Sequence, residues 1–394
     1  MTELEKLLQA YCPDGVEYRK IGEVVEYEQP SKYIVNSTNY NDDFETPVLT
    51  AGQSFILGYT DETDGRYPAS KENPVIIFDD FTAAFKWVDF PFKVKSSAMK
   101  MLKANEDIAT LRYIFHIMGH LNYSSDEHKR LWISIYSEFP IPVPPLPVQS
   151  EIVKILDNFT ELTAELTAEL TARKKQYEYY RDSLMTFSES DTVKYVELGE
   201  IATVTKLAGF EFTNYVTYSD EGKIIALRGL NVKNGKLDLN DVKYIDNSDL
   251  SKLTRSKLRI GDMLFTYVGT VGQVALINED DRYYLAPNVA LIRVEKPFLK
   301  PEFMRYYFQT NIFWNTQINR LLQSSSMKNI PMEKIRKFVL PIPPIEEQER
   351  VVAILDRFDA LCNDISIGLP AEIEARKKQY EYYRDKLLSF EEVC

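Results

Sequence analysis

Two stretches of the chain place apolar residues at the spacing of a long α-helix. The first follows a proline-rich segment and has apolar residues at Ile152, Val153, Ile155, Leu156, Phe159, Leu162, Leu166 and Leu170. The second has them at Val351, Val352, Ile354, Leu355, Phe358, Leu361 and Ile365. Residues three and four positions apart share one face of a helix, so each stretch predicts a helix with an apolar stripe. A stripe along an otherwise acidic helix needs a partner, and we expect each helix to pack against the other.

The two helical stretches belong to a duplication that covers the whole chain. The segment ARKKQYEYYRD occurs at 172–182 and again, unchanged, at 375–385. PPLPVQSEIVKILDNF (144–159) likewise matches PPIEEQERVVAILDRF (343–358). The chain is therefore two copies of one plan, and copies of this length are far too long for a solenoid repeat.

The variable stretches before each helix, roughly 25–138 and 202–337, have the pattern of short strands. Runs such as NPVIIFDD and DMLFTYVG are apolar or alternating and are bounded by Gly, Asp and Asn. An Asn-Gly pair within 231–237 predicts a β-hairpin, and one helix is expected in each stretch, around 109–123 and 301–318. We therefore expect an α+β fold in which two mixed α/β domains, related by an internal pseudo-twofold repeat, are joined by two long antiparallel helices.

The two copies differ in length within the helix. The offset between them is 199 positions before the helix and 203 at the ARKKQ segment, because the first helix contains the tandem unit TAELTAELTA (163–172). The second copy has Gly368 and Pro370 at this point, which predict a kink or a restart of the helix. Four residues lengthen a helix by about 6 Å, so the unit is suited to adjusting length; a harmless repeat in a solvated helix is the alternative.

The charge is unevenly distributed. The net charge of the chain is −12, which argues against a nucleic-acid partner. Residues 193–342, however, carry 21 Lys and Arg against 16 Asp and Glu, whereas residues 16–145 carry 13 against 19. One region is therefore mildly basic, and most of the acid lies in the helical repeats.

The cysteine and histidine residues do not form a metal-binding pattern. Cys12, Cys362 and Cys394 are far apart in the sequence, so neither a disulfide framework nor a zinc site is expected. His116 and His120 have the spacing of helical metal ligands, but they lie in an apolar run without a nearby acidic or cysteine partner in the sequence. We expect no metal site.

Motifs of catalytic sites are missing from the sequence. It contains no P-loop, no G-x-G-x-x-G after a strand and no G-x-S-x-G elbow. The G-x-x-G at 269–272 has the form of a KH-domain clamp, but it lies between strand-like runs and predicts a hairpin turn. No targeting stretch and no membrane-spanning apolar run is evident, so we expect a cytoplasmic protein without a membrane partner.

Candidate contact residues follow from side-chain type. Arg and Lys pair with guanine, Asn and Gln with adenine, and Ser and Thr with either base. The DNA-binding candidates in the first copy are Thr50, Gln53, Thr82, Lys86, Lys93, Lys95, Ser96 and Ser97. Those in the second copy are Lys206, Arg228, Asn231, Lys233, Ser324, Ser325, Ser326 and Lys328.

The identical helical segment supplies candidates for subunit docking. Surface Lys, Gln and Tyr side chains are not needed for packing, so their repetition favours two copies of one docking surface over a generic helical hairpin. The candidates are Arg173, Lys174, Lys175, Tyr177, Tyr180, Arg376, Lys377, Lys378, Tyr380 and Tyr383.

Together these features resemble the specificity subunit (S, HsdS) of a Type I restriction-modification system. The resemblance covers essentially the whole chain and rests on the proline-rich segments before the helices, the TAEL units, both ARKKQYEYYRD copies, and CPDGVEYRKIGEV near the start. The run DFTAAFKWVDFPFKVKSSAMKML also resembles a recurring type of target domain. The resemblance implies an N-terminal segment (1–15), a first target recognition domain (16–145), a central helical spacer (146–192), a second target recognition domain (193–342) and a C-terminal helical spacer (343–394).

The resemblance also implies a function. Each target recognition domain would read one half of a bipartite site in double-stranded DNA, while the helices fix the spacing. The chain itself would be non-catalytic and hold no cofactor. Two methylation subunits carrying S-adenosylmethionine would dock on it, and restriction subunits that use ATP and Mg²⁺ would join this core. A methyltransferase-nuclease fusion and a protein-binding helical scaffold without DNA readout are the alternatives.

Overall fold

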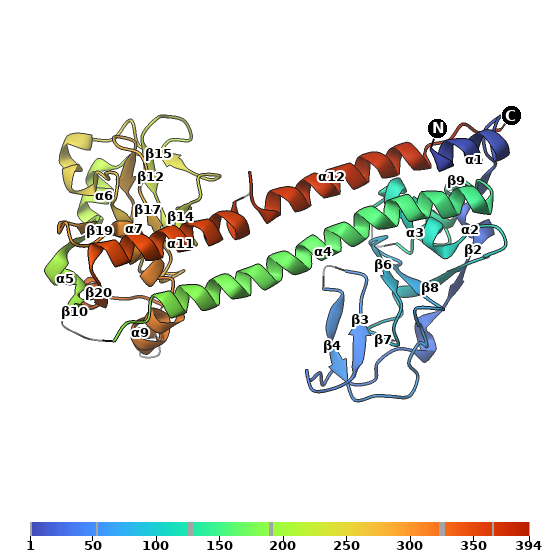
Figure 1. Cartoon of the computed structure of the whole chain (residues 1–394), viewed down its shortest axis with the longest axis horizontal. Helices are drawn as coiled ribbons and strands as arrows, with labels where there is room; N and C mark the ends of the chain where they lie inside the picture. The colour runs from blue at the N-terminus through green and yellow to red at the C-terminus, as the bar shows by residue number, and fades with distance from the viewer. Residues whose placement is uncertain are drawn as a thin grey trace. The chain divides into compact units, whose positions relative to one another are not determined.

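The chain folds into two compact units (Figure 1). The computed structural model describes residues 2–52, 54–124, 129–188, 192–322, 328–364 and 366–393. Unit 1 consists of Met1–Thr167 and Glu372–Cys394, and unit 2 consists of Ala168–Ala371. Among the described residues, no helix is both long and apolar enough to cross a membrane.

Unit 1 is built on two β-sheets. An antiparallel four-stranded sheet has the order β2 (Val25–Glu28), β8 (Met99–Ala104), β5 (Val75–Asp79) and β6 (Phe85–Val88). A three-stranded sheet has the order β4 (Ile56–Thr60), β3 (Thr46–Leu49) and β7 (Lys93–Val94), with β3 and β7 parallel. The helices of this unit before the spacer are α1 (Glu3–Tyr11), α2 (Ile21–Val24) and α3 (Leu111–Leu121).

Unit 2 repeats both sheets in the same order. Its four-stranded sheet is β11 (Ala202–Lys206), β19 (Val289–Val294), β16 (Met263–Thr266) and β17 (Val274–Leu276). Its three-stranded sheet is β15 (Lys243–Tyr244), β12 (Ile225–Leu227) and β18 (Tyr283–Leu285), again with one parallel pair. The further elements are α5 (Leu198–Ile201), α6 (Gly209–Tyr215), α7 (Pro301–Tyr307), α8 (Asn311–Phe313), a π-helical turn (Trp314–Ile318), α9 (Asn319–Leu322) and α10 (Met332–Arg336).

Each copy is closed by a two-stranded antiparallel ribbon. In unit 1, β1 (Tyr18–Lys20) pairs with β9 (Pro140–Pro142). In unit 2, β10 (Lys194–Glu197) pairs with β20 (Val339–Ile342). The ribbon joins the first strand of each copy to the proline-rich segment that leads into the long helix. Shared ribbons and shared sheet order confirm the duplication seen in the sequence.

The long helices form as the apolar stripes predict, with one break. The helix α4 (Leu146–Leu184) is continuous over 39 residues. The second copy is divided into α11 (Ile345–Asn363) and α12 (Leu369–Leu388), which confirms the predicted restart. At the break, a Cβ atom on Gly368 would lie 2.5 Å from the carbonyl oxygen of Ala360. Only glycine fits this close approach, and Pro370 then falls in the first turn of α12, where its missing N–H costs nothing.

Aromatic side chains pack the long helices together inside each unit. In unit 1, Phe159 of α4 stacks on Tyr383 of α12 with ring centroids 5.1 Å apart. In unit 2, Tyr180 of α4 stacks on Phe358 of α11 at 5.5 Å. The two pairs are equivalent by the repeat, since Phe159 matches Phe358 and Tyr180 matches Tyr383. The expected packing between the helices of the two copies is therefore confirmed within each unit.

Two predicted turns and one predicted helix are confirmed, and one helix differs. The hairpin of β13 (Val232–Lys233) and β14 (Lys236–Leu237) turns at Asn234 and Gly235, both with positive φ. The turn at 269–272 connects β16 to β17, and α3 falls within 109–123. The helix expected over 301–318 is instead interrupted. The side chain of Thr310 accepts a hydrogen bond from the Phe313 amide and starts a new helix there.

Candidate nucleic-acid interface

A buried glutamine joins the domain of each copy to the long helix that follows it. The Gln149 side chain, fully buried, accepts a hydrogen bond from the Thr110 amide at 3.0 Å and donates to the carbonyls of Ile108 and Pro144 at 2.9 and 2.8 Å. Gln348, also fully buried, makes the same three contacts with Lys300, Phe298 and Pro343 at 2.9, 2.8 and 2.8 Å. Because the three bonds approach one amide from different directions, they fix the start of the helix against the domain.

An aspartate about two turns further along the helix makes a second connection. Arg112 of α3 lies 2.8 Å from the Asp157 carboxylate. In the second copy, Arg305 of α7 lies 3.2 Å from Asp356. The hydrogen bond between the Tyr306 hydroxyl and Asp356 adds to this contact. The same pair of charges therefore holds both domains to their helices.

His116 lies within this connection in unit 1. Its Nε2 is 2.8 Å from Asp157 and its Nδ1 is 3.0 Å from the Tyr380 hydroxyl, so the acidic partner that the neighbouring sequence lacks comes from another helix. The contact joins residues 41 positions apart, which local sequence cannot show. Burial lowers the pKa of His116, although Asp157 opposes the shift. Among the described residues, no cluster of three His, Cys, Asp or Glu is arranged to hold a metal ion.

The repeated segment ARKKQYEYYRD has one side that packs inside its own unit and one side that is exposed. Tyr177 is only 7% exposed and packs into the core of unit 2, and burial raises the pKa of Tyr177 to about 12. Tyr380 is half-buried against His116. The premise that these tyrosines are not needed for packing is therefore wrong, because part of the repeated sequence serves intramolecular contacts in both units.

The outward face of the segment carries lysines and a different tyrosine. Lys174 and Lys175 are exposed, and Tyr179 is 69% exposed. Arg173 instead bonds along its own helix to Glu169 and Gln176.

The second copy of the segment has the same outward face. Lys377, Lys378 and Tyr382 are exposed, Tyr382 at 62%, and Arg376 bonds along its helix. The partly exposed Tyr180 and Tyr383 stack on phenylalanines as described above. Sequence analysis missed Tyr179 and Tyr382, since only the helix orientation separates them from the neighbouring tyrosines.

Among the candidates of the first copy, the structure brings Thr50 and Lys95 together. They follow the adjacent parallel strands β3 and β7, and the Lys95 amide donates to the Leu49 carbonyl. Lys95 and the neighbouring Ser96 and Ser97 are exposed. This cluster lies at the carboxyl end of the three-stranded sheet.

The other candidates of the first copy are scattered. Lys93 is 3% exposed and pairs with Glu62 at 2.7 Å, so its charge is used within the domain. Thr82 and Lys86 are exposed on a separate hairpin, between and within β5 and β6. Gln53 lies outside the described residues.

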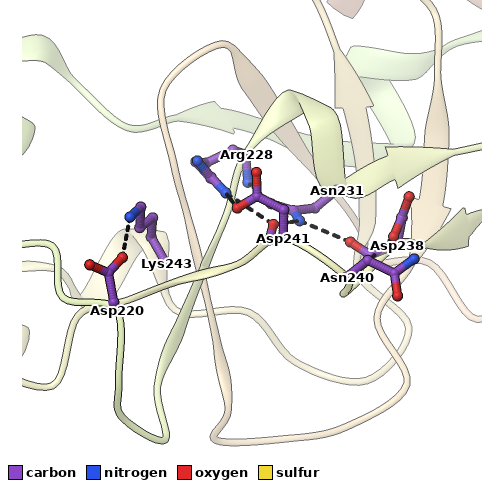
Figure 2. Close-up of polar contacts among 7 residues, drawn as sticks. All are labelled: Asp220, Arg228, Asn231, Asp238, Asn240, Asp241 and Lys243. Carbon is purple, nitrogen blue, oxygen red and sulfur yellow. Dashed lines mark hydrogen bonds and ion pairs between the residues drawn. The ribbon is translucent and has the colours of Figure 1, made fainter. Parts of the chain in front are cut away.

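The candidates Arg228, Asn231 and Lys233 of the second copy are engaged within the domain, and Figure 2 shows the contacts of Arg228 and Asn231. Asn231 is fully buried, and its amide donates to the carbonyls of Asp238 and Asp241 at 2.8 and 2.7 Å. Arg228 pairs with the Asp241 carboxylate at 2.7 Å, and Lys233 pairs with Asp238 at 2.6 Å. Asn231 therefore has a structural position, with no surface from which to reach a base.

A groove of about 630 Å³ on unit 2 gathers cations that are free of such pairs. Lys206, Arg255 and Arg336 line it from three separate segments, and Glu333 is the acid that lines it. Within the described chain, none of the three cations forms an ion pair. Lys206 extends over the ring of Tyr267, with its Nζ 5.9 Å from the centroid. The groove is therefore a site of positive potential.

Two of the remaining candidates of the second copy, Lys206 and Lys328, lie at or near this groove. Lys206 lines it, and Lys328 is exposed next to the lining residue Asn329. Ser324, Ser325 and Ser326 lie outside the described residues. Sequence analysis missed Arg255 and Arg336, and no local signal marks them, because only the fold distinguishes an unpaired cation from a paired one.

The equivalent groove of unit 1 has the opposite character. It measures about 450 Å³ and is lined by Lys20, Glu23 and Glu138 among others. The two grooves lie at matching positions of the repeat. A Cβ on Gly22 would lie 3.0 Å from Ser137, and a Cβ on the matching Gly199 would lie 3.2 Å from Arg336, which is the residue that matches Ser137. Lys20 is paired with Glu138 at 2.6 Å and also attracts Glu23, so one positive charge faces two negative charges among these residues.

Comparison with known proteins agrees with this architecture. The family described as the Type I restriction modification DNA specificity domain matches residues 13–173 and 190–375, once for each copy. The chain therefore belongs to this family. It is 42% identical to the Type I restriction enzyme EcoR124I/EcoR124II specificity subunit of Escherichia coli, over 99% of this chain and 97% of that protein. It is 29% identical to a putative type I restriction enzyme specificity subunit of Haemophilus influenzae, over 99% and 98%.

Solved structures share the fold at low sequence identity. The S subunit of a Type I restriction-modification system from M. genitalium aligns with a TM-score of 0.57 and 12% identity, covering 95% of this chain and 96% of that chain. A chain from a structural study of type I R-M complex assembly and conformational transition aligns with a TM-score of 0.59 and 16% identity, covering 95% and 98%. Both likenesses support the two-copy fold.

Proposed function

We propose that this chain is the DNA sequence-specificity subunit of a Type I restriction-modification complex. Each target recognition domain reads one half of a bipartite site in double-stranded DNA. The observation that carries the proposal is the double match to the DNA specificity domain family, one match over each copy of the same sheet architecture. Two copies with one topology but different surface chemistry suit two half-sites of different sequence, which disfavours a scaffold without DNA readout.

The long helices set the distance between the two half-sites. The continuous helix α4 spans 39 residues, and the buried glutamines and the partly exposed aspartates fix each domain to its own helix start. A helix rises about 1.5 Å per residue, so residues added inside α4 convert directly into length. The TAEL units lie between Asp157, which holds the first domain, and Tyr177, which packs into the core of unit 2; within them, Leu170 also packs against that core.

The outward face of the repeated segment docks two methylation subunits. Two identical sequences with the same exposed residues suit two copies of one partner. Tyr179 and Tyr382 are the aromatic side chains at the centre of these faces, and exposed lysines flank both. Large aromatic residues often carry most of the binding energy at an interface.

The chemistry belongs to the partner subunits. The methylation subunits bind S-adenosylmethionine and methylate an adenine in each half-site, and restriction subunits use ATP and Mg²⁺. This chain contributes recognition and geometry and carries no catalytic residue of its own.

Methylome sequencing of a strain that expresses this chain with its partner subunits tests the proposal. The expected result is a new bipartite methylated motif with a fixed gap, absent when the chain is deleted. A methylome that is unchanged by the presence of the chain would reject the proposal in favour of a scaffold.

A further inference from the structure

We infer that the cationic groove of unit 2, lined by Lys206, Arg255 and Arg336, holds the phosphodiester backbone of the DNA. The second target recognition domain then supplies the larger electrostatic share of binding, although both domains read sequence. The inference rests on the proposed function, because that function makes DNA the ligand.

The first argument is that these cations are available. Several other cations of unit 2 are used in ion pairs, such as Arg228 with Asp241 at 2.7 Å and Arg293 with Asp262 at 2.6 Å. Such a cation must give up its carboxylate before it binds a phosphate. The groove cations form no ion pair with any described residue, so a phosphate displaces no bound carboxylate from them, and the three positive charges outnumber the one negative charge of Glu333. Contacts of this kind release counterions and supply sequence-independent affinity.

The second argument is geometric. Arg336 donates to the Val204 carbonyl at 2.9 Å, which holds its guanidinium across β11. Lys206 ends that strand, and Arg255 lies in the short 3-10 turn Thr254–Ser256 that packs against it. Three segments distant in sequence therefore present their charges on one groove, and a strand and two helical turns support the charged groups.

The third argument is the contrast with the equivalent groove of unit 1. There Lys20 is neutralised by Glu138, and Glu23 adds a negative charge. Ile133 lies on the same groove and is 63% exposed. A phosphate would be repelled at this place, so the two copies engage the DNA backbone differently.

The salt dependence of DNA binding tests the inference. The complete complex with its methylation subunits is titrated with a duplex carrying the methylated motif and with a scrambled duplex, from about 0.05 to 0.3 M salt. Each phosphate contact contributes about −0.9 to the slope of log K against log salt. We expect the combined variant Lys206→Ala, Arg255→Ala, Arg336→Ala to flatten the slope by about 2 to 3 and weaken both duplexes by at least about tenfold.

Two further variants control the experiment. The double variant Lys206→Ala, Arg255→Ala keeps the Arg336 contact with the backbone and guards against misfolding; we expect it to flatten the slope by about 2. Lys20→Ala in the equivalent groove removes the same charge and should leave the slope unchanged.

The outcomes separate the inference from the proposed function. A wild-type complex that binds neither duplex at low salt would overturn the proposed function, and the inference with it. Normal binding by the wild type with an unchanged slope in both groove variants would overturn the inference alone. Loss of only the motif-bearing duplex at unchanged slope would also overturn it, because the groove would then read bases.

Discussion

The Tyr18 hydroxyl donates a hydrogen bond of 2.9 Å to the main-chain carbonyl of Phe390, which lies 372 positions later in the chain. In unit 2, the Tyr195 hydroxyl makes the same bond to the Phe187 carbonyl at 2.7 Å, across only eight positions. The C-terminal segment around Phe390 therefore lies beside β1 in unit 1. In unit 2, the segment around Phe187, which links the two copies, occupies the equivalent position beside β10. The two copies are therefore connected in a ring: the peptide chain joins the first copy to the second, and hydrogen bonds join the C-terminal segment back to the first copy.

This closure predicts that the chain tolerates circular permutation. The Val16 amide donates to the Glu391 carbonyl at 2.9 Å, so the C-terminal segment lies beside the N-terminal part of unit 1 and a linker can join the two ends of this sequence. New ends placed between Ser188 and Thr192 then lie between the two copies. We expect the permuted chain to fold with a melting temperature within about 5 °C of the parent and to direct methylation of the same half-sites, since the flanking Ser188 and Thr192 are both exposed.

Cyclic closure would be contradicted if the permuted protein accumulated in inclusion bodies and a permutation opened inside β5 gave at least as much soluble protein. The β5 permutation is the control, because it cuts the central sheet of unit 1.

The Gln149 contacts predict a large loss of stability on truncation. Replacing Gln149 by Ala leaves the buried Thr110 amide and two carbonyls without partners, at a cost of about 2 to 4 kcal/mol in the free energy of unfolding. Gln348→Ala should cost a similar amount. Urea unfolding measures both, and the exposed Gln379→Ala, expected within about 0.5 kcal/mol of wild type, is the control. Equal effects at Gln149 and Gln379 would refute the clamp.

The contacts of Asn231 predict that its substitution lowers stability, whereas the sequence had suggested that Asn231 reads a base. Asn231→Ala removes the hydrogen bonds to the carbonyls of Asp238 and Asp241 and should cost about 2 to 3 kcal/mol of stability. The neighbouring Asn240 is exposed, so Asn240→Ala is the matched control, with an expected change below about 0.5 kcal/mol. A stable Asn231→Ala protein with an altered methylation motif would contradict the buried position.

His116 predicts a pH dependence with a defined sign. Burial lowers the pKa of His116 in the folded protein, and the charges of Arg112 and Arg384 act in the same direction, against Asp157. The unfolded chain therefore binds a proton first as the pH falls below about 6.5. Stability from the neutral histidine is complete above this pH and is lost as the pH falls through the lowered folded pKa.

The substitution His116→Gln tests this dependence, because the second copy carries Gln309 at the matching position. We expect the melting temperature of the wild type to fall more steeply than that of His116→Gln between about pH 7 and pH 5. Parallel curves for the two proteins would show that His116 does not titrate with unfolding.

Local patterns in the sequence were sufficient for some features. The apolar spacing of α4, the Asn234-Gly235 turn and the break near Gly368 follow from periodicity and backbone preference, which short segments contain. The helix expected over 301–318 was not found as one piece, because the Thr310 cap competes with the apolar pattern that runs through it.

The candidate contacts were harder to predict because they depend on tertiary pairing. Asn231 and Lys233 have suitable side chains, yet folding commits both to nearby backbone or carboxylate groups. Arg255 and Arg336 looked ordinary in the sequence and acquire a site only through the convergence of separate segments. Residue type alone therefore predicted that Lys and Arg side chains would form the site, but it did not predict which of them the fold brings together.

Deletion of one TAEL unit from α4, followed by methylome sequencing, tests most directly that the helices set the distance between two readers. Four residues shorten the helix by about 6 Å and turn it by only about 40°, so the domains keep nearly the same face. A two-residue deletion is the control, because it turns the helix by about 200° and should abolish methylation. The expected result for the TAEL deletion is unchanged half-sites with a gap shorter by at most about two base pairs. Altered half-sites separated by the original gap would contradict it.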